Sequence, residues 1–241
     1  MFSEIAPSYD LLNHLLSLNI DKRWRARALR SLQWDRQPAG LYLDLCAGTL
    51  DVSVELSRRP GFRGFVVGAD FAEPMLRAAR RKAVGLPVAP VVADALDLPL
   101  VSGCCAGAVV AFGVRNLANL DAGLREIARV LDHGARLIIL EFSTPRAAIV
   151  RTVYHAYFHR VLPLVGRLVS GHPTAYRYLP QSVVNFPAAE ELALRMRAAG
   201  FVNVSFTTLS FGIAAIHVGE RTVLRPARTE EALASAGGEM R

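Results

Sequence analysis

The hydrophobic positions of this chain form short apolar runs that are separated by segments with helical spacing. From Gly40 onward the two patterns alternate, which is typical of βα units stacked around a parallel sheet. Each run is almost wholly apolar, as expected of a strand that is buried on both faces. The predicted strands cover residues 41–45, 64–70, 90–93, 106–112 and 136–142.

Residues typical of helix ends lie between these strands. Proline follows Glu73 at the start of one helical segment, and glycine closes each of three segments. The predicted helices run over 72–85, from Asn119 or Asp121 to Gly134, and from 187–191 to Gly200.

After Gly200 the pattern predicts two further strands with no helix between them, so we expect these strands to pair as a hairpin. Five βα units followed by this hairpin give an α/β fold. The expected sheet has seven strands, is mostly parallel and ends in an antiparallel C-terminal hairpin.

Two segments are additional to this pattern. Residues 1–36 carry leucines and Trp24 at helical spacing and are predicted to form a helical cap, which either covers one end of the core or acts as a lid over a ligand. Residues 146–187 form an aromatic, basic and acid-free insertion after strand five, which is unusual for a connector. We therefore expect one domain over 1–221, followed by a disordered tail over 222–241.

Composition limits the possible classes of protein. The chain has 241 residues, of which 52% are hydrophobic and 20% charged, so a folded domain with a sizeable core is expected. Its three cysteines (Cys46, Cys104 and Cys105) suit neither a disulfide framework nor a zinc site. No apolar stretch is long enough to span a bilayer and no signal-peptide pattern begins the chain. We expect a cytoplasmic protein.

The formal net charge of +7 is concentrated in two stretches. Residues 142–187 contain five arginines and no acid, and residues 58–82 contain seven basic residues and two acids. These stretches are either solvated faces or a docking surface for anionic lipid, which would place the protein at the membrane periphery. Nucleic acid is not an expected partner, because no nucleic-acid-binding motif accompanies the charge.

Candidate cofactor residues follow the predicted strands, where open parallel sheets bind ligands. The first turn runs from Asp44 to Asp51 and contains Gly48, but it lacks both the dinucleotide fingerprint and the P-loop pattern. NAD, FAD and ATP are therefore poor candidates.

Two further acids stand after strands two and three. Asp70 lies 26 residues after Asp44, where a carboxylate can accept hydrogen bonds from ribose hydroxyls, or can instead cap the following helix. Asp94 is placed to accept from an adenine amino group, or is an ordinary turn acid.

Together these residues resemble the class I S-adenosylmethionine (SAM) methyltransferases, which have a Rossmann-like fold. Other blocks resemble the ubiquinone/menaquinone biosynthesis C-methyltransferase family, which includes demethylmenaquinone methyltransferases. These blocks are FSEIAPSYDLLN (2–13), FGVRNL (112–117), LEFSTP (140–145), AYRYLPQS (175–182) and the triplet at 185–187. The resemblance implies methyl transfer from SAM to a ring carbon of a demethylated polyprenyl quinol, without a metal.

By this resemblance the turn that holds Asp44 and Gly48 binds SAM, and several other residues fall at the family's SAM-contacting positions. These are Thr49, Asp70, Asp94, Ala95 and Ala111. The family usually has glycine where Leu50 stands and often has serine where Ala111 stands. Leucine is strained at positive φ and its side chain would approach the cofactor, so a non-enzymatic scaffold stays open as an alternative.

The implied reaction also suggests catalytic groups. A phenol-like pKa of ~10 opposes ionisation of the quinol, and a cation aimed at the developing oxyanion offsets that cost. Arg115, directly after strand four, is the first candidate and Asn116 could orient the ring oxygen, although Arg115 could instead pair with Glu141.

The insertion supplies a second pool of donors or bases, namely Tyr154, His155, Tyr176 and Tyr178. Apolar residues over 161–165 and 168–169 would form a wall for the polyprenyl tail, or would simply seal the core. Another phenolic small molecule is an alternative acceptor, and a homo-oligomer is compatible with the sequence.

Overall fold

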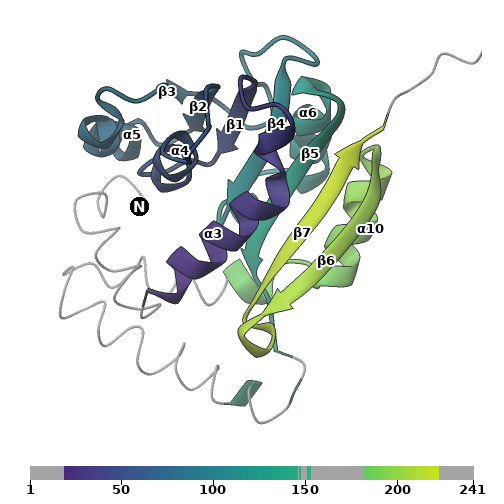
Figure 1. Ribbon diagram of the computed structural model, residues 1–241. Helices are drawn as coiled ribbons and strands as arrows, with labels where there is room; N and C mark the ends of the chain where they lie inside the picture. The colour runs from purple at the N-terminus through teal and green to yellow at the C-terminus, as the bar shows by residue number, and fades with distance from the viewer. Residues whose placement is uncertain (1–18, 146, 148–150, 153–181, 223–241) are drawn as a thin grey trace, which may run out of the picture.

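A seven-stranded sheet in the order β3-β2-β1-β4-β5-β7-β6 forms the centre of the molecule (Figure 1). The computed structural model describes residues 19–145, 147, 151–152 and 182–222. The strands are β1 (Leu41–Leu45), β2 (Phe65–Asp70), β3 (Val88–Val92), β4 (Cys105–Ala111), β5 (Leu131–Phe142), β6 (Phe201–Leu209) and β7 (Ala214–Arg221). The helices are α3 (Ile20–Leu32), α4 (Asp51–Ser57), α5 (Glu73–Ala79), α6 (Leu120–Val130) and α10 (Ala189–Ala198).

Strand pairing confirms the predicted α/β class. The first five strands pair in parallel, whereas β7 is antiparallel to both β5 and β6. The β6–β7 hairpin therefore closes one edge of a mostly parallel sheet, as the absence of a helix between the two strands predicts.

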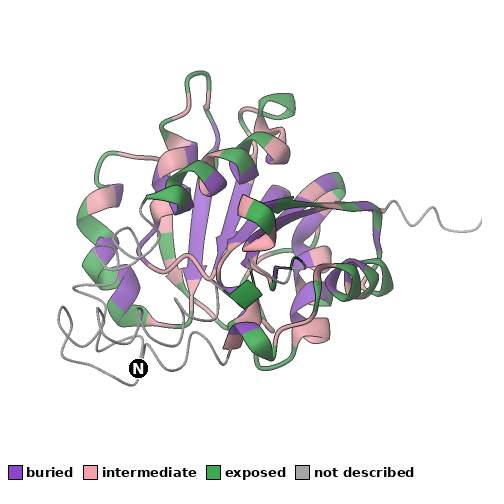
Figure 2. Cartoon of the chain, turned by 90° about the horizontal axis from the view of Figure 1, so that it is seen from below, coloured by how far each residue is buried: buried purple, intermediate pink, exposed green. Residues whose placement is uncertain are grey.

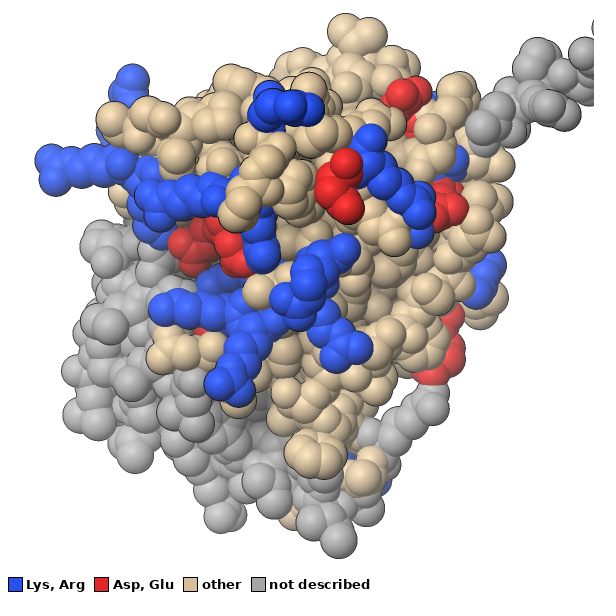
Figure 3. All heavy atoms as spheres, in the orientation of Figure 1, with Lys and Arg blue, Asp and Glu red and all other residues tan. Residues whose placement is uncertain are grey.

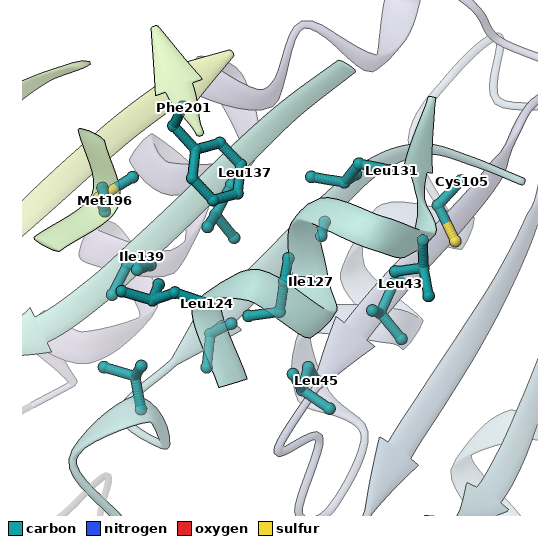
Figure 4. Close-up of a cluster of buried hydrophobic side chains, with 14 of the residues drawn as sticks. Leu43, Leu45, Cys105, Leu124, Ile127, Leu131, Leu137, Ile139, Met196 and Phe201 are labelled. Carbon is teal, nitrogen blue, oxygen red and sulfur yellow. The ribbon is translucent and has the colours of Figure 1, made fainter. Parts of the chain in front are cut away.

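Two hydrophobic cores lie on opposite faces of this sheet, and successive β5 residues alternate between them. Leu137 and Ile139 pack with α6 and α10, in the cluster drawn in Figure 4. Ile138 and Leu140 pack with α3, α4 and α5 on the other face. Because both faces are covered, the central strands β1, β4 and β5 are largely buried between two layers of helices (Figure 2), whereas β3 and β6 at the two edges of the sheet are more exposed.

Helix α3 lies within the predicted N-terminal cap. Trp24, Ala28, Leu29 and Leu32 are all buried in the core, which is the covering role that their spacing allows. The rest of the cap, most of the insertion and the tail lie outside the described residues, so their predicted roles stay predictions.

Several predicted boundaries are wrong for local reasons. Helix α6 ends at Val130 rather than Gly134, because the buried Leu131 already pairs with Cys105 at the start of β5. Gly134 has a φ of +73° within β5, where the register with β4 shifts. Helix α5 ends at Ala79 and continues as the 3₁₀ turn Arg80–Ala83.

Two expected features near the sheet differ as well. The segment between β3 and β4 forms turns rather than a helix, so the third βα unit has no helix of its own. Strand β4 ends at Ala111 because Phe112 adopts a φ of +60°, which extended backbone does not allow.

Among the described helices, none has the length and apolar character needed to cross a bilayer.

Candidate active site

The candidate site lies at the carboxyl ends of β1 and β4, where the strand order reverses direction. Three non-glycine residues in the two loops adopt left-handed backbone, with φ values of +56° at Cys46, +63° at Leu50 and +60° at Phe112. Such backbone costs roughly 1–3 kcal/mol per residue and gathers at functional sites. Three of the eight described non-glycine residues with positive φ therefore lie at the edge of the sheet that the motifs indicate.

The two loops meet closely at Gly113. A Cβ atom at this position would lie 2.2 Å from the Cβ of Cys46 and 2.9 Å from its Sγ. Only glycine allows this approach, so Gly113 determines how the loop that carries Arg115 sits against the first turn.

Asp70 joins the ends of β1 and β2. Its Oδ2 accepts a hydrogen bond from the backbone N–H of Gly48 at 2.7 Å, and its Oδ1 accepts from that of Ala72 at 2.7 Å. Ala72 is the N-cap residue of α5, and Asp70 bonds to the N–H of that cap residue rather than to the free N–H groups of the first helical turn. The helix-cap interpretation of Asp70 is therefore wrong. Each carboxylate oxygen has a second lone pair, so both can accept a further hydrogen bond from a ligand.

The other predicted cofactor residues lie around Asp70. The N–H of Ala93 donates to the Asp70 carbonyl at 3.1 Å, which brings the turn after β3 beside the end of β2. In this turn the exposed Asp94 accepts from the Leu96 N–H at 2.9 Å, and Ala95 is buried. Thr49 is buried beside Gly48, and Ala111 is half-buried at the end of β4.

Asp44 lies beneath this site rather than on its surface. It is buried, and its Oδ2 accepts from the Ser53 N–H at 2.9 Å and from the Ser53 hydroxyl at 2.6 Å. Burial raises the pKa of Asp44 to about 7, although both Ser53 hydrogen bonds oppose that shift. In this structure Asp44 holds the first turn of α4 to β1.

Leu50 does adopt the positive φ that the sequence makes costly, but its side chain is fully buried. It packs toward β2, where a Cβ atom at Gly68 would lie 2.4 Å from the Leu50 Cδ2. A side chain held in this core does not reach the open edge of the sheet, so the expected approach of Leu50 to a cofactor is wrong.

Arg115 forms a buried ion pair with Glu141, as its alternative interpretation predicts. Its Nη1 lies 2.8 Å from the Glu141 Oε1, and the two side chains are only 5% and 1% exposed. Nη1 also donates to the Phe112 carbonyl, and Nε donates to the Ser182 hydroxyl at 3.3 Å. Burial raises the pKa of Glu141, whereas the Arg115 guanidinium opposes that shift.

A cavity of about 430 Å³ opens beside Arg115. Its apolar lining includes Leu117 and Phe186, and its polar lining includes Ser182 and Asn185. The described end of the insertion thus meets the loop after β4, in a cavity of the size that small ligands occupy.

Sequence reasoning missed some residues of this region. Phe71 follows Asp70 directly and is 80% exposed, a level unusual for an aromatic side chain. An aromatic residue next to the ribose candidate was a signal that could have identified it. Ser182 and Asn185 belong to quoted motif blocks, but no local pattern predicted that they line a cavity with Arg115.

The other predicted catalytic residues are less well defined. Asn116 is exposed in the 3₁₀ turn Val114–Asn116, next to Arg115. Tyr154, His155, Tyr176 and Tyr178 lie outside the described residues. Within the described ranges, no three His, Cys, Asp or Glu side chains group as metal ligands would.

Solved structures share this fold. A SAM-dependent methyltransferase of Thermotoga maritima aligns with a TM-score of 0.57 and 19% identity, over 90% of this chain and 98% of that one. A SAM-dependent methyltransferase of Aquifex aeolicus aligns with a TM-score of 0.55 and 21% identity, over 76% of this chain and 82% of that one. The architecture is that of the class I SAM-dependent methyltransferases.

Sequence comparison identifies the family. The model of the ubiE/COQ5 methyltransferase family matches residues 1–221. A demethylmenaquinone methyltransferase of Thermus thermophilus is 52% identical, over 92% of this chain and 100% of that protein. A ubiquinone/menaquinone biosynthesis C-methyltransferase of Geobacter sulfurreducens is 41% identical, over 92% of this chain and 87% of that protein. The chain belongs to the ubiE/COQ5 methyltransferase family and is a SAM-dependent C-methyltransferase.

The close approach at Gly113 can be tested by a double-mutant cycle. Gly113→Ala should lower the free energy of unfolding by about 2–3 kcal/mol, because the new methyl group overlaps the Cys46 side chain. Adding Cys46→Gly removes the overlap at a position with positive φ, and should restore most of that loss. Urea denaturation of the three variants measures the coupling, and additive losses would contradict the assigned contact.

The buried Asp44 predicts a pH-dependent stability. Its pKa of about 7 in the folded chain exceeds the ordinary value of 3.8, so the folded state binds more protons than the unfolded state between about pH 4 and pH 7. Its contribution to stability therefore falls as the pH rises through this window. Relative to the wild type, Asp44→Asn should become steadily more stable from about pH 4 to pH 7. Denaturant titrations measure the free energy of unfolding of both proteins at each pH. A difference between the two that stays constant from about pH 4 to pH 7 would contradict the raised pKa of Asp44.

Proposed function

We propose that this chain transfers a methyl group from SAM to a ring carbon of a demethylated polyprenyl quinol. The observation that carries the proposal is the Arg115 guanidinium, which is fixed by Glu141 and faces a cavity at the carboxyl edge of the sheet. The names of the Thermus and Geobacter relatives support a quinone precursor as the acceptor.

The residues at the ends of β1, β2 and β3 fit a nucleoside. Asp70 would hold the ribose hydroxyls with its remaining lone pairs, while Gly48 leaves room above the first turn. Among the described residues, a Cβ atom at Gly48 would meet only the Met75 Cε, at 3.7 Å. Phe71 would pack against the base, and Asp94 would accept from its amino group. When bound, SAM supplies an electrophilic methyl group on a sulfonium.

Arg115 would stabilise the acceptor as its hydroxyl loses a proton. A guanidinium has five N–H donors. Those on Nη1 and Nε bond to Glu141, Phe112 and Ser182, and Nη2 is engaged by none of the contacts recorded between described residues. Nη2 can therefore donate to the developing oxyanion, while the ion pair holds the group in place.

Arginine stays protonated and does not act as the base itself. Asn116 beside it would orient the ring oxygen, and Tyr154 or Tyr176 of the insertion would accept the proton. Apolar side chains of the cavity would exclude water from the ring. The same arrangement also suits smaller phenols, so we compare acceptors directly.

The acceptor class is tested by mass spectrometry of methylated products. Demethylmenaquinol, demethylated ubiquinol precursors and soluble phenols are offered at equal concentration with SAM. The proposal predicts that a quinol acceptor is methylated on carbon with the highest kcat/KM. Faster methylation of a simple phenol would indicate a different acceptor.

Asp70→Ala should weaken SAM binding by about 1–3 kcal/mol, because the ribose hydroxyls lose their acceptor. Isothermal titration calorimetry measures the affinity, and a thermal melt checks that the loss of the Gly48 and Ala72 contacts has not unfolded the chain. Asp97→Ala, at an exposed acid on the turn after β3, is the matched control and should bind normally. Equal affinity in both variants would place the nucleoside elsewhere.

Arg115→Lys keeps a positive charge beside the buried Glu141, whereas alanine would leave that carboxyl unpaired at a cost of about 3–5 kcal/mol. A lysine ammonium cannot bond to Glu141 and donate to the acceptor with the same geometry. We expect kcat to fall roughly a hundredfold with SAM affinity unchanged. Arg125→Lys on the exposed side of α6 is the control, and an unaltered kcat in Arg115→Lys would remove Arg115 from catalysis.

A further inference from the structure

The outer face of α3 carries a row of exposed cations. Lys22, Arg23, Arg27 and Arg30 point to solvent, while the opposite side of the helix is buried on the sheet. Within the described part of the chain these four side chains form no ion pair; the one acid of the helix, Asp21, is bound to Arg25 instead. The row is therefore a positive surface that no described acid neutralises.

The positive surface extends beyond α3. Asp51, at the start of α4, lies 3.2 Å from Arg25 and 2.8 Å from Lys82, so its charge is already compensated. The neighbouring Arg80 and Arg81 are exposed. In Figure 3, lysine and arginine side chains gather over the face that carries α3, α4 and α5.

An exposed aromatic residue lies beside α3. Phe211, in the β6–β7 turn, is 86% exposed and has a φ of +60°. The Trp24 indole N–H of α3 donates to the Ser210 hydroxyl at 3.1 Å, and the Ser143 hydroxyl donates to the Gly212 carbonyl at 2.7 Å. The turn is thus anchored on both sides. It nevertheless holds the bulky Phe211 side chain in water, on a strained backbone.

We propose that α3 and the β6–β7 turn form a docking face for a bilayer containing anionic phospholipid. Lys22, Arg23, Arg27 and Arg30 contact lipid phosphates, and Phe211 inserts among the headgroups. Basic residues near a charged membrane each add about a factor of five in affinity, and aromatic side chains favour the interface. The inference rests on the proposed function, since its acceptor carries a polyprenyl tail.

The exposed Phe211 beside the cations favours lipid over nucleic acid, because aromatic side chains favour the membrane interface. The Trp24 ring lies 6.4 Å from that of Phe142, and Phe142 lies 5.6 Å from the Arg115 guanidinium. Trp24 lies on the buried side of α3, so these ring contacts connect the docking face to Arg115 through the core. The cavity itself is lined from α6, α10 and the segment that begins at Ser182, on the other face of the sheet.

Vesicle co-sedimentation of the full chain tests the charge. We expect binding to vesicles of phosphatidylglycerol and phosphatidylcholine, and its loss in high salt or with phosphatidylcholine alone. Arg23→Gln with Arg27→Gln should weaken binding roughly thirtyfold. Arg63→Gln with Arg125→Gln removes the same charge from exposed positions outside α3 and should bind as the wild type does. Equal losses in both pairs would overturn the assigned face.

Phe211→Gly separates docking from folding. Glycine relieves the strained φ, so the melting temperature should hold or rise, whereas vesicle affinity should fall roughly tenfold. An unchanged vesicle affinity would overturn the insertion of Phe211. Binding to DNA duplexes or single strands, with none to vesicles, would overturn the lipid assignment.

A tail-free demethylmenaquinol analogue distinguishes this inference from the proposed function. All docking variants should methylate the soluble analogue at the wild-type rate and lose rate only on the vesicle-embedded quinol. If the wild type does not methylate the analogue, the proposed function fails. If it methylates the analogue but does not bind anionic vesicles, only the docking proposal fails.

Discussion

The buried ion pair between Arg115 and Glu141 is the constraint on which the site depends. Burying two charges costs several kcal/mol unless further hydrogen bonds compensate for the lost water. Here the Phe112 carbonyl and the Ser182 hydroxyl accept from Arg115, while the Phe142 N–H donates to Glu141 at 2.9 Å. These contacts join the ends of β4 and β5 to the segment that begins at Ser182, so one charged pair holds together three parts of the chain beside the cavity.

The backbone around this pair is strained for a related reason. Phe112 leaves the strand in a left-handed conformation, which lets its carbonyl bond to Arg115, and Gly113 then passes close to Cys46. The first turn is drawn to β2 in the same way by Asp70, through Gly48. Packing energy from both cores offsets this local strain, as rigid scaffolds do for functional loops.

Much of the fold could be predicted from the sequence, because buried parallel strands are apolar throughout and helix ends carry glycine, proline or a capping Asn119. The α6–β5 boundary failed because Leu131 continues the apolar pattern of the helix while pairing in the sheet. The places of Asp70 and Arg115 at the ends of strands made them candidates, and the structure places both at the carboxyl edge of the sheet. The core position of Leu50 and the cavity contacts of Ser182 depend on tertiary packing, which has no local pattern.

The central claim is that Arg115, held by Glu141, donates to the ring oxygen of a quinol while Asp70 holds the nucleoside. A crystal structure with S-adenosylhomocysteine and an unreactive demethylmenaquinol analogue tests it most directly. We expect the ribose hydroxyls on Asp70 and a ring oxygen within hydrogen-bond distance of the Arg115 Nη2. A nucleoside bound elsewhere, or a ring oxygen that faces away from Arg115, would contradict the account.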